Sequence, residues 1–295
     1  MAKTDLADVA NQIQKFWSPL FMDELRLSLP MVNLLDKKYD GQIKNLGDTV
    51  YISQINSPNG QLKTAGTDAD TFETEKLTTS RVAIQANKRA VASVEVEDLV
   101  QLQSQLGDPA ATASIRASLM YAVAKQINTY LYSLVSPSTS SPDHLINSVT
   151  DFNATQVAGV RLLASQAKWM KDGRWYIAAD PSYYNDVLSA TTMTSGDYVD
   201  DKAIIEGQVA TKRFGFTIVE DNSLAVDQAV AFHPDFLHFV KQTEVNFKLS
   251  DLHPVGKFGY VLSADLMFGA GLGISGSKKH ILVNASASAS SVVMA

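Results

Sequence analysis

The chain has 295 residues, 45% hydrophobic and 19% charged, which is typical of an ordered globular protein long enough for two domains. It contains no cysteine, which excludes disulfides, thiol catalysis, zinc–thiolate sites and iron–sulfur clusters. The formal charge of −6 argues against a primary nucleic-acid binder, because the basic pairs Lys212–Arg213 and Lys278–Lys279 stand isolated in the sequence and form no basic stripe.

The N-terminal segment shows no targeting signal. Its first eight residues lack the apolar core of a signal peptide, and no later window approaches the roughly 20 apolar residues of a membrane span. We therefore expect a soluble protein, intracellular when made, with no membrane partner. Across residues 5–39 apolar side chains recur at roughly helical spacing, interrupted by Pro19 and Pro30, which predicts short broken helices in an N-terminal arm of residues 1–48.

Residues 49–98 are predicted to form an extended loop. The segment 49–55 alternates as a strand does, a polar excursion with turn residues follows, and a run rich in β-branched residues returns over 78–97. Lys88 and Arg89 interrupt that run, as charges on an exposed strand edge do. We expect a long two-stranded hairpin with a polar tip. Because an isolated hairpin is marginally stable in water, we expect it to lie on a neighbouring copy of the chain.

A long helix is predicted next. Asp108 and Pro109 have the residue types of a helix N-cap and first helical position, and apolar side chains follow at spacings of three and four. The pattern predicts a spine helix over 109–135, about 39 Å long at 1.5 Å per residue. A linker rich in Ser and Pro, 136–142, follows it. We assign 99–149 and 229–284 to one peripheral domain containing this helix.

Residues 150–228 read as an inserted α/β unit, the axial domain. A helix is predicted after 153–156, a buried strand over 174–179, a helix starting at 180–182, a polar loop over 191–201 and a strand over 213–219. Four further strands are predicted at 229–232, 236–240, 245–249 and 260–267, and we expect them to complete a sheet beside the spine helix. The final residues, 285–295, are mostly small, so we expect a flexible tail with little to bury.

Histidines and glycines do not form a known chemical motif. No two of the five histidines stand at the i, i+4 spacing of a zinc protease, and His233, Asp235 and His238 come closest to a metal cluster. The glycine-rich stretch 269–276 lacks the Lys-Ser/Thr of a phosphate loop, and Ser275 is not in a Gly-x-Ser-x-Gly elbow. We expect a structural role for the His233, Asp235 and His238 group; the other histidines of the sequence are His144, His253 and His280.

Carboxylates are the remaining candidates for acid–base chemistry. Glu95 and Glu97 share one face of a predicted strand near Lys88 and Arg89, so we expect ion pairs between strands or between subunits there. The other carboxylates considered, Asp98 and the pair Asp200 and Asp201, read as solvated. The sequence therefore predicts no catalytic residue, no cofactor and no metal site.

The order of these features resembles that of the major capsid proteins of tailed double-stranded DNA bacteriophages, which have the HK97-like fold. The resemblance covers nearly the whole chain and lies in the order of its elements: the arm, the extended loop, the spine helix, the inserted axial domain and the return to the peripheral sheet. The segments that carry it are 16–20, 40–41, 47–50, 92–98, 178–181 and 215–219. It implies an α+β protein of this fold.

The resemblance also implies a function. Copies of the chain would form hexamers and pentamers of an icosahedral shell that encloses packaged double-stranded DNA, with non-specific DNA contact, a separate scaffolding protein and a portal protein as partners. The loop would lie across the adjacent subunit and the axial domain would face the ring centre. The virion capsid would be its location, after assembly in the host bacterial cytoplasm. Some proteins of this family form an isopeptide cross-link between a loop lysine and an asparagine of a neighbouring subunit. Lys63 and Lys76 lie in the loop, but no local motif identifies the partner asparagine.

Two other functions remain open from the sequence. An encapsulin-like shell of a bacterial compartment would use a similar fold around a protein cargo. An α/β enzyme with an unrecognised site would instead show a pocket lined by carboxylates or histidines with shifted pKa values.

Overall fold

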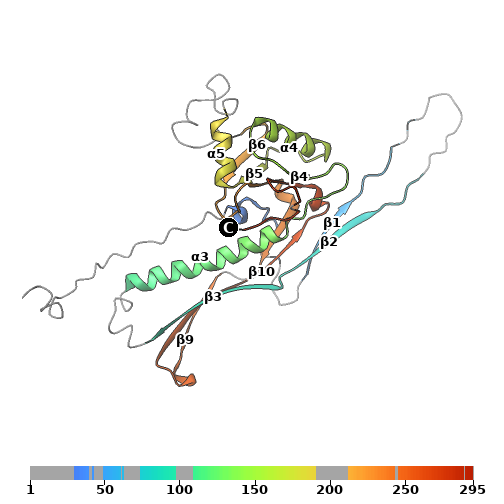
Figure 1. The fold of residues 1–295 in the computed structure, drawn as a ribbon. Helices are drawn as coiled ribbons and strands as arrows, with labels where there is room; N and C mark the ends of the chain where they lie inside the picture. Colours follow the sequence, from blue (N-terminus) through green and yellow to red (C-terminus); the bar gives the residue numbers. More distant parts are fainter. Residues whose placement is uncertain are drawn as a thin grey trace, which may run out of the picture.

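The computed structural model describes residues 30–39, 42, 49–60, 62, 74–97, 109–190, 212–242, 245–288 and 290–294. A long helix crosses the middle of the molecule between two groups of strands, and a hairpin extends away from the body (Figure 1). The helices predicted before residue 30 lie outside the described residues, as do Lys63, Asp98, Asp108 and the loop 191–201 with Asp200 and Asp201.

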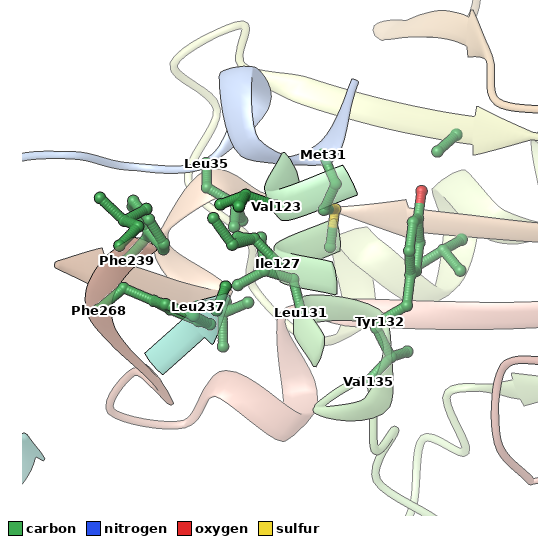
Figure 2. Close-up of a cluster of buried hydrophobic side chains, with 14 of the residues drawn as sticks. Met31, Leu35, Val123, Ile127, Leu131, Tyr132, Val135, Leu237, Phe239 and Phe268 are labelled. Atoms are coloured by element: carbon green, nitrogen blue, oxygen red, sulfur yellow. The ribbon is translucent and has the colours of Figure 1, made fainter. Parts of the chain in front are cut away.

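Helix α3 (Pro109–Ser133) is the predicted spine helix. Its buried side chains recur every four residues, at Leu119, Val123, Ile127 and Leu131, so one stripe faces the core. Figure 2 shows this stripe meeting the short helix α1 (Met31–Leu34) through Met31 and the strands through aromatic side chains. The prediction of an amphipathic helix over 109–135 is therefore confirmed to within two residues at its end.

The sheet packed on α3 is built around one long strand, β10 (Gly259–Leu272). Strand β3 (Lys88–Glu97) pairs antiparallel with it along one edge. The other edge of β10 pairs with β9 (Asn246–Asp251) over its first half and with β8 (Leu237–Lys241) at its end. All three pairings are antiparallel, and the face with Ala90, Ala264 and Leu266 is buried under the helix.

The predicted returning strand of the hairpin is divided between two sheets. Strand β1 (Thr49–Ile55) pairs antiparallel with β2 (Thr79–Gln85) alone, from Thr49–Gln85 to Ile55–Thr79. After Ala86 and Asn87 the chain continues as β3 in the β10 sheet. The prediction of one hairpin strand over 78–97 is thus wrong beyond Gln85, because β-branched composition favours a strand without specifying its partner.

A second sheet of five strands has the order β4-β11-β7-β5-β6. Strand β5 is parallel to β6 and β11 is parallel to β4, whereas β7 is antiparallel to both β5 and β11. The strands are β4 (Leu145–Ile146), β5 (Trp175–Ala179), β6 (Phe216–Glu220), β7 (Gln228–Phe232) and β11 (His280–Asn284). Two of them differ from the prediction: β7 lies in this sheet, apart from β8, β9 and β10 with which one sheet was expected, and β11 was not predicted.

This sheet is a wall shared by two cores. Alternate side chains such as Val230 and Leu282 point to the α3 core, whereas Ala231 and Ile281 point to a second core with helices α4 (Ala154–Gln166) and α5 (Pro181–Ser189). All residues of β7 and β11 are buried. The boundary expected at residue 228 therefore separates strands that share one sheet.

Local capping fixes both helices of the second core. The Asn153 side chain accepts a hydrogen bond from the Thr155 N–H, and the Asp180 carboxylate accepts from the N–H groups of Ser182 and Tyr183. Asp180 also accepts from the Asp227 N–H at 3.1 Å, so this N-cap ties α5 to the turn before β7. The helices and the strand predicted between them are confirmed.

The C-terminal residues pack against the body. Leu224 and Met294 form an antiparallel bridge, the Ala225 N–H donates to the Val293 carbonyl, and the Val293 N–H donates to Oε1 of Gln228. Val292 and Met294 lie against the α3 core. The expectation of a tail with little to bury is wrong, because two large apolar residues follow the small ones and reach an open edge of the core.

A buried polar network joins α3 to the five-stranded sheet. The Tyr132 hydroxyl donates to Asp221 at 2.6 Å, and Asp221 also accepts from the Ser223 hydroxyl and N–H. Asn128 donates to the Ser223 hydroxyl at 3.0 Å. Burial and the neighbouring Asp221 charge raise the pKa of Tyr132 well above its ordinary value, so its hydroxyl keeps its proton.

Two histidines belong to the core. His280 in β11 is buried against Phe236, with ring centroids 5.0 Å apart, and its Nδ1–H donates to the Gly276 carbonyl. Burial lowers the pKa of His280 to about 4. His144, also fully buried, has its pKa lowered mainly by burial as well. Both side chains are therefore neutral at pH 7.

Replacing Tyr132 with Phe should lower the free energy of unfolding by about 1–3 kcal/mol, because one Asp221 oxygen loses its donor in a buried site. Urea denaturation measures this loss. Tyr176→Phe is the matched control: its ring packs on Phe232 and its hydroxyl has no partner among the described residues, so we expect a change within about 0.5 kcal/mol. Equal losses in the two variants would contradict the role of the network.

His280 should make the fold sensitive to acid. The unfolded chain takes up this proton near pH 6.5 and the folded chain near pH 4, so stability is full above pH 6.5 and falls between these values. The loss is about 1.4 kcal/mol per pH unit. His280→Asn keeps a donor to the Gly276 carbonyl without the titration, so its urea denaturation should depend less on pH between 6 and 5. An unchanged pH dependence would refute the prediction.

Candidate assembly surfaces

The base of the β1–β2 hairpin is docked on the body. Val50, Ile52 and Ile84 are buried together with Val240 of β8, with Tyr39 and Ile274 at the margin. These hairpin residues share one face, since Val50 is opposite Ile84 and Ile52 is opposite Val82. The first two residue pairs of this face therefore fix the direction in which the hairpin leaves the body.

The outer part of the hairpin has no such cover. Residues 53–60 and 74–79 are exposed, and this part extends away from the rest of the molecule (Figure 1). Side chains continue the pairing beyond the strands: Asn56 Nδ2 donates to Thr78, and the Asn59 amide groups donate to the Glu75 carboxylate at 2.9 Å. These bonds lower the pKa of Glu75, which is fully exposed. The projection is thus an ordered ladder at least as far as Asn59.

Large apolar side chains lie on this projection. Tyr51, Ile55 and Leu77 are 60%, 64% and 68% exposed. Tyr51 and Ile55 share the face opposite the docked one, and the Arg81 guanidinium lies 5.3 Å from the Tyr51 ring centroid. Apolar groups gathered on an exposed projection are typical of a contact surface. We call Tyr51, Ile55 and Leu77 the hairpin surface.

A second projection is formed by β9 and the turn after it. All six residues of β9 are exposed, and the turn contains the 3-10 helix η4 (His253–Val255) (Figure 1). Leu249 is 69% exposed and Phe258 72%. Phe247 and Leu249 face the same side as Ala264 and Leu262, where α3 does not cover them. We call Phe247, Leu249 and Phe258 the β9 surface.

Charged residues on the other face of the β10 sheet pair within the chain. Arg89 donates to the Asp265 carboxylate at 2.6 and 2.9 Å, and the Lys257 ammonium donates to Glu95 at 2.9 Å. The Lys88 ammonium lies 5.4 Å from the Tyr130 ring centroid. The ion pairs expected near Glu95 form within one chain. Arg89 pairs with Asp265 between β3 and β10, whereas Glu95 pairs with Lys257 in the turn before β10 and not with Lys88 or Arg89.

The other three histidines, His233, His238 and His253, each contact different neighbours. His233 Nδ1 accepts from the Asp235 N–H, and its Nε2 lies 3.2 Å from both Asp172 oxygens. His238 sits edge-on to Tyr39, and burial lowers its pKa. His253 stacks edgewise on Phe258. Within the described part of the chain no three His, Asp or Glu side chains are placed to share a metal ion.

The glycine-rich stretch 269–276 serves close packing. A Cβ on Gly269 would overlap the Gln85 carbonyl, so this glycine lets β2 cross β10 closely. Ser275 has a φ of 58° and lines the same cavity as His233. Because both His233 nitrogens already have partners, neither is left to act as a base for Ser275.

Sequence reasoning located the projecting hairpin but not its apolar side chains or the β9 surface. Leu77 and Phe258 stand in polar stretches, and that contrast is a signal the sequence did contain. The helices of the described segments include none long and apolar enough to span a membrane.

The whole fold matches solved structures from bacteriophages. No protein-family model and no curated protein sequence matches the chain. A chain from Mycobacterium phage Che8 is 17% identical, with a TM-score of 0.72 over 92% of this chain and 97% of that one. A chain of the capsid of cyanophage P-SCSP1u is 16% identical, with a TM-score of 0.71 over 95% of both chains. A chain of the capsid asymmetric unit of cyanophage Pam1 is 12% identical, with a TM-score of 0.68 over 98% of this chain and 100% of that one.

These matches span nearly the full length of both partners, so they concern the complete arrangement of hairpin, spine helix and two sheets. Identities of 12–17% with such TM-scores indicate a shared fold. The chain therefore has the fold of these phage capsid structures, and the predicted HK97-like α+β class is confirmed.

Proposed function

We propose that the chain is the major capsid protein of a tailed bacteriophage, which assembles through hexamers and pentamers into an icosahedral shell around packaged double-stranded DNA. The observation that carries the proposal is the β1–β2 hairpin: its outer part, residues 53–60 and 74–79, is exposed among the described residues, and the chain has the fold of capsid subunits. An ordered ladder with apolar side chains exposed on it needs another surface to bury them.

In the proposed shell the hairpin lies across the adjacent subunit. The extended loop of the sequence analysis is then represented by residues 49–85, since β3 belongs to the body. Tyr51, Ile55 and Leu77 would be buried by the neighbour. Burying a large apolar side chain contributes about 1.5–3 kcal/mol. The three side chains of the hairpin surface would therefore contribute several kcal/mol to the contact between two subunits.

The β9 surface supplies a second contact in a different direction, because it leaves the opposite side of the body (Figure 1). The unit with α4, α5 and the five-stranded sheet would face the centre of the ring, and residues 1–48 would form an arm. Several modest contacts from each subunit then combine into a stable shell by multivalency.

The same proposal assigns the remaining partners. A scaffolding protein and a portal protein would act during assembly in the host bacterial cytoplasm, and the finished subunit would be located in the virion. We propose no enzymatic activity: the buried histidines and carboxylates described above have structural partners, and His233 is fully engaged by Asp172 and Asp235. The capsid likeness favours this reading over an α/β enzyme.

Replacing Tyr51 and Ile55 with Thr should abolish closed shells while leaving a folded subunit. Threonine keeps the strand propensity but removes most of the apolar surface. Negative-stain electron microscopy and analytical sedimentation measure assembly, and thermal unfolding checks the fold. We expect particles for the wild type and unassembled subunits or rings for the variant.

Ser53→Ala with Thr79→Ala is the matched control, because both residues are exposed on the same face of the same two strands. This control should assemble as the wild type does. Normal shells from the Tyr51 and Ile55 variant would overturn the role of the hairpin surface. A wild type that stays monomeric with every neighbouring gene product would overturn the capsid proposal. Particles that enclose a protein cargo and no DNA would favour the compartment shell.

A further inference from the structure

Basic side chains from three distant parts of the sequence surround the turn 167–174, which joins α4 to β5. The sequence shows Lys212 and Lys278–Lys279 as separate short groups, but the fold brings both to this turn. Six residues make up this basic patch: Arg161, Lys168, Lys171, Lys212, Lys278 and Lys279.

One side of the turn borders a cavity of about 440 Å³. Lys168, Lys278 and Lys279 line it, together with Ile274 and the hairpin residue Gln54. Hydrogen bonds hold the backbone of Lys278 and Lys279 in place. The Trp169 indole donates to the Lys278 carbonyl at 2.6 Å, and the His233 N–H donates to the Lys279 carbonyl at 3.0 Å. The three ammonium groups therefore start from fixed backbone positions around one hollow.

The other side of the turn borders a smaller and more open hollow of about 160 Å³, with Arg161 and Lys171 in its lining. The Lys212 ammonium donates to the Gly173 carbonyl at 3.0 Å, which places it at the same turn. The Arg161 guanidinium donates to the Phe214 carbonyl and lies 5.6 Å from the Trp175 ring centroid. Positive charge thus extends across both sides of the turn.

The carboxylates near the patch are already engaged. Asp172 accepts from Arg174 at 2.7 Å and contacts His233, and Asp235 pairs with Lys38 and is also attracted by the patch residue Lys279. Burial opposes ionisation of Asp172, but hydrogen bonds from Arg174 and the interaction with His233 outweigh it and lower its pKa to about 2. In the described part of the chain, none of the six patch residues forms an ion pair with a carboxylate.

A cluster of cations on an otherwise acidic chain attracts anions to that part of the surface. With a formal charge of −6 for the whole chain, the surface outside the patch is more acidic still. Lysine ammonium groups act as point charges that suit phosphates. Apart from Arg161 on α4, the patch residues lie in turns, irregular segments or the short 3-10 helix η5 (Gly276–Lys278), so we expect them to contact phosphates and not base edges.

We propose that the basic patch binds the phosphate backbone of duplex DNA without reading its sequence. The inference rests on the proposed function only for the source of the DNA, which would be the packaged genome. It gives the non-specific DNA contact a location on the subunit. The alternative occupant, an acidic face of a second copy of the chain, is separated from it by the experiment below.

The test measures binding of a fluorescently labelled 30-base-pair duplex to the full-length, unassembled chain by anisotropy, as a function of salt. Replacing Lys278 and Lys279 with Gln should make the negative slope of log K against log salt shallower by about 1.8, since each phosphate contact contributes about −0.9. At 0.1 M salt this corresponds to roughly 60-fold weaker binding. A second duplex of different sequence should give the same values.

Lys125→Gln with Lys248→Gln is the matched control, because both lysines are exposed outside the patch and the net charge changes equally. The control should bind DNA as the wild type does, and equal losses in the two double variants would refute a localised site. Lys168→Gln with Lys171→Gln tests the same patch from another segment, which covers the case in which the Lys278 and Lys279 variant fails to fold.

Electron microscopy of the same preparations separates the two proposals. If the patch binds a second copy, the Lys278 and Lys279 variant will bind DNA normally but lose shells, and the DNA inference falls. If wild-type shells form and every patch variant binds DNA normally, the inference falls while the capsid proposal stands. Weakened DNA binding in a chain that never assembles would retain the inference and overturn the capsid proposal.

Discussion

The rest of the structure depends on burying both faces of the five-stranded sheet. Strands β7 and β11 have no exposed residue, so each face needs its own layer: α3 with the β10 sheet on one side, and α4 with α5 on the other. The alternation of Val230 and Ala231, or of Ile281 and Leu282, commits one strand to two cores at once. A one-residue change of register would exchange the two sets of side chains between the two cores, and both cores would have to repack, so the register of this sheet is strongly specified.

The rigidity of this body gives the projections a fixed direction. At the base of the hairpin, Val50 and Ile84 are buried against Val240. Tyr51 and Ile55 lie on the opposite face of the hairpin and are exposed. The hydrogen bond between Tyr132 and Asp221 joins the spine helix to the five-stranded sheet. A contact surface carried on such a support loses little conformational freedom when a partner covers it, and that lowers the free-energy cost of assembly.

The charged residues of the surface are paired in one region and clustered with one sign in another. On the β10 sheet opposite charges are neutralised within the chain, as in the pairs of Arg89 with Asp265 and Lys257 with Glu95. Around the turn 167–174 the carboxylates of the described residues pair with Arg174, His233 and Lys38, and none of them forms an ion pair with a lysine of the patch, although Asp235 is also attracted by Lys279. Exposed ion pairs add little stability, so the more informative feature is the part of the surface where charge is left uncompensated.

The sequence by itself determined the elements whose signals are local. The repeat of apolar residues from Leu119 to Leu131 defined the spine helix, and Asn153 and Asp180 marked the starts of two helices, because periodicity and capping act within a few residues. Together with the order of elements this was sufficient for the fold class. Only the tertiary structure decided which strands pair, where the C-terminus packs and how separate lysines meet. Those outcomes depend on contacts between residues far apart in the chain, and no local pattern encodes the partner of a strand or of a charge.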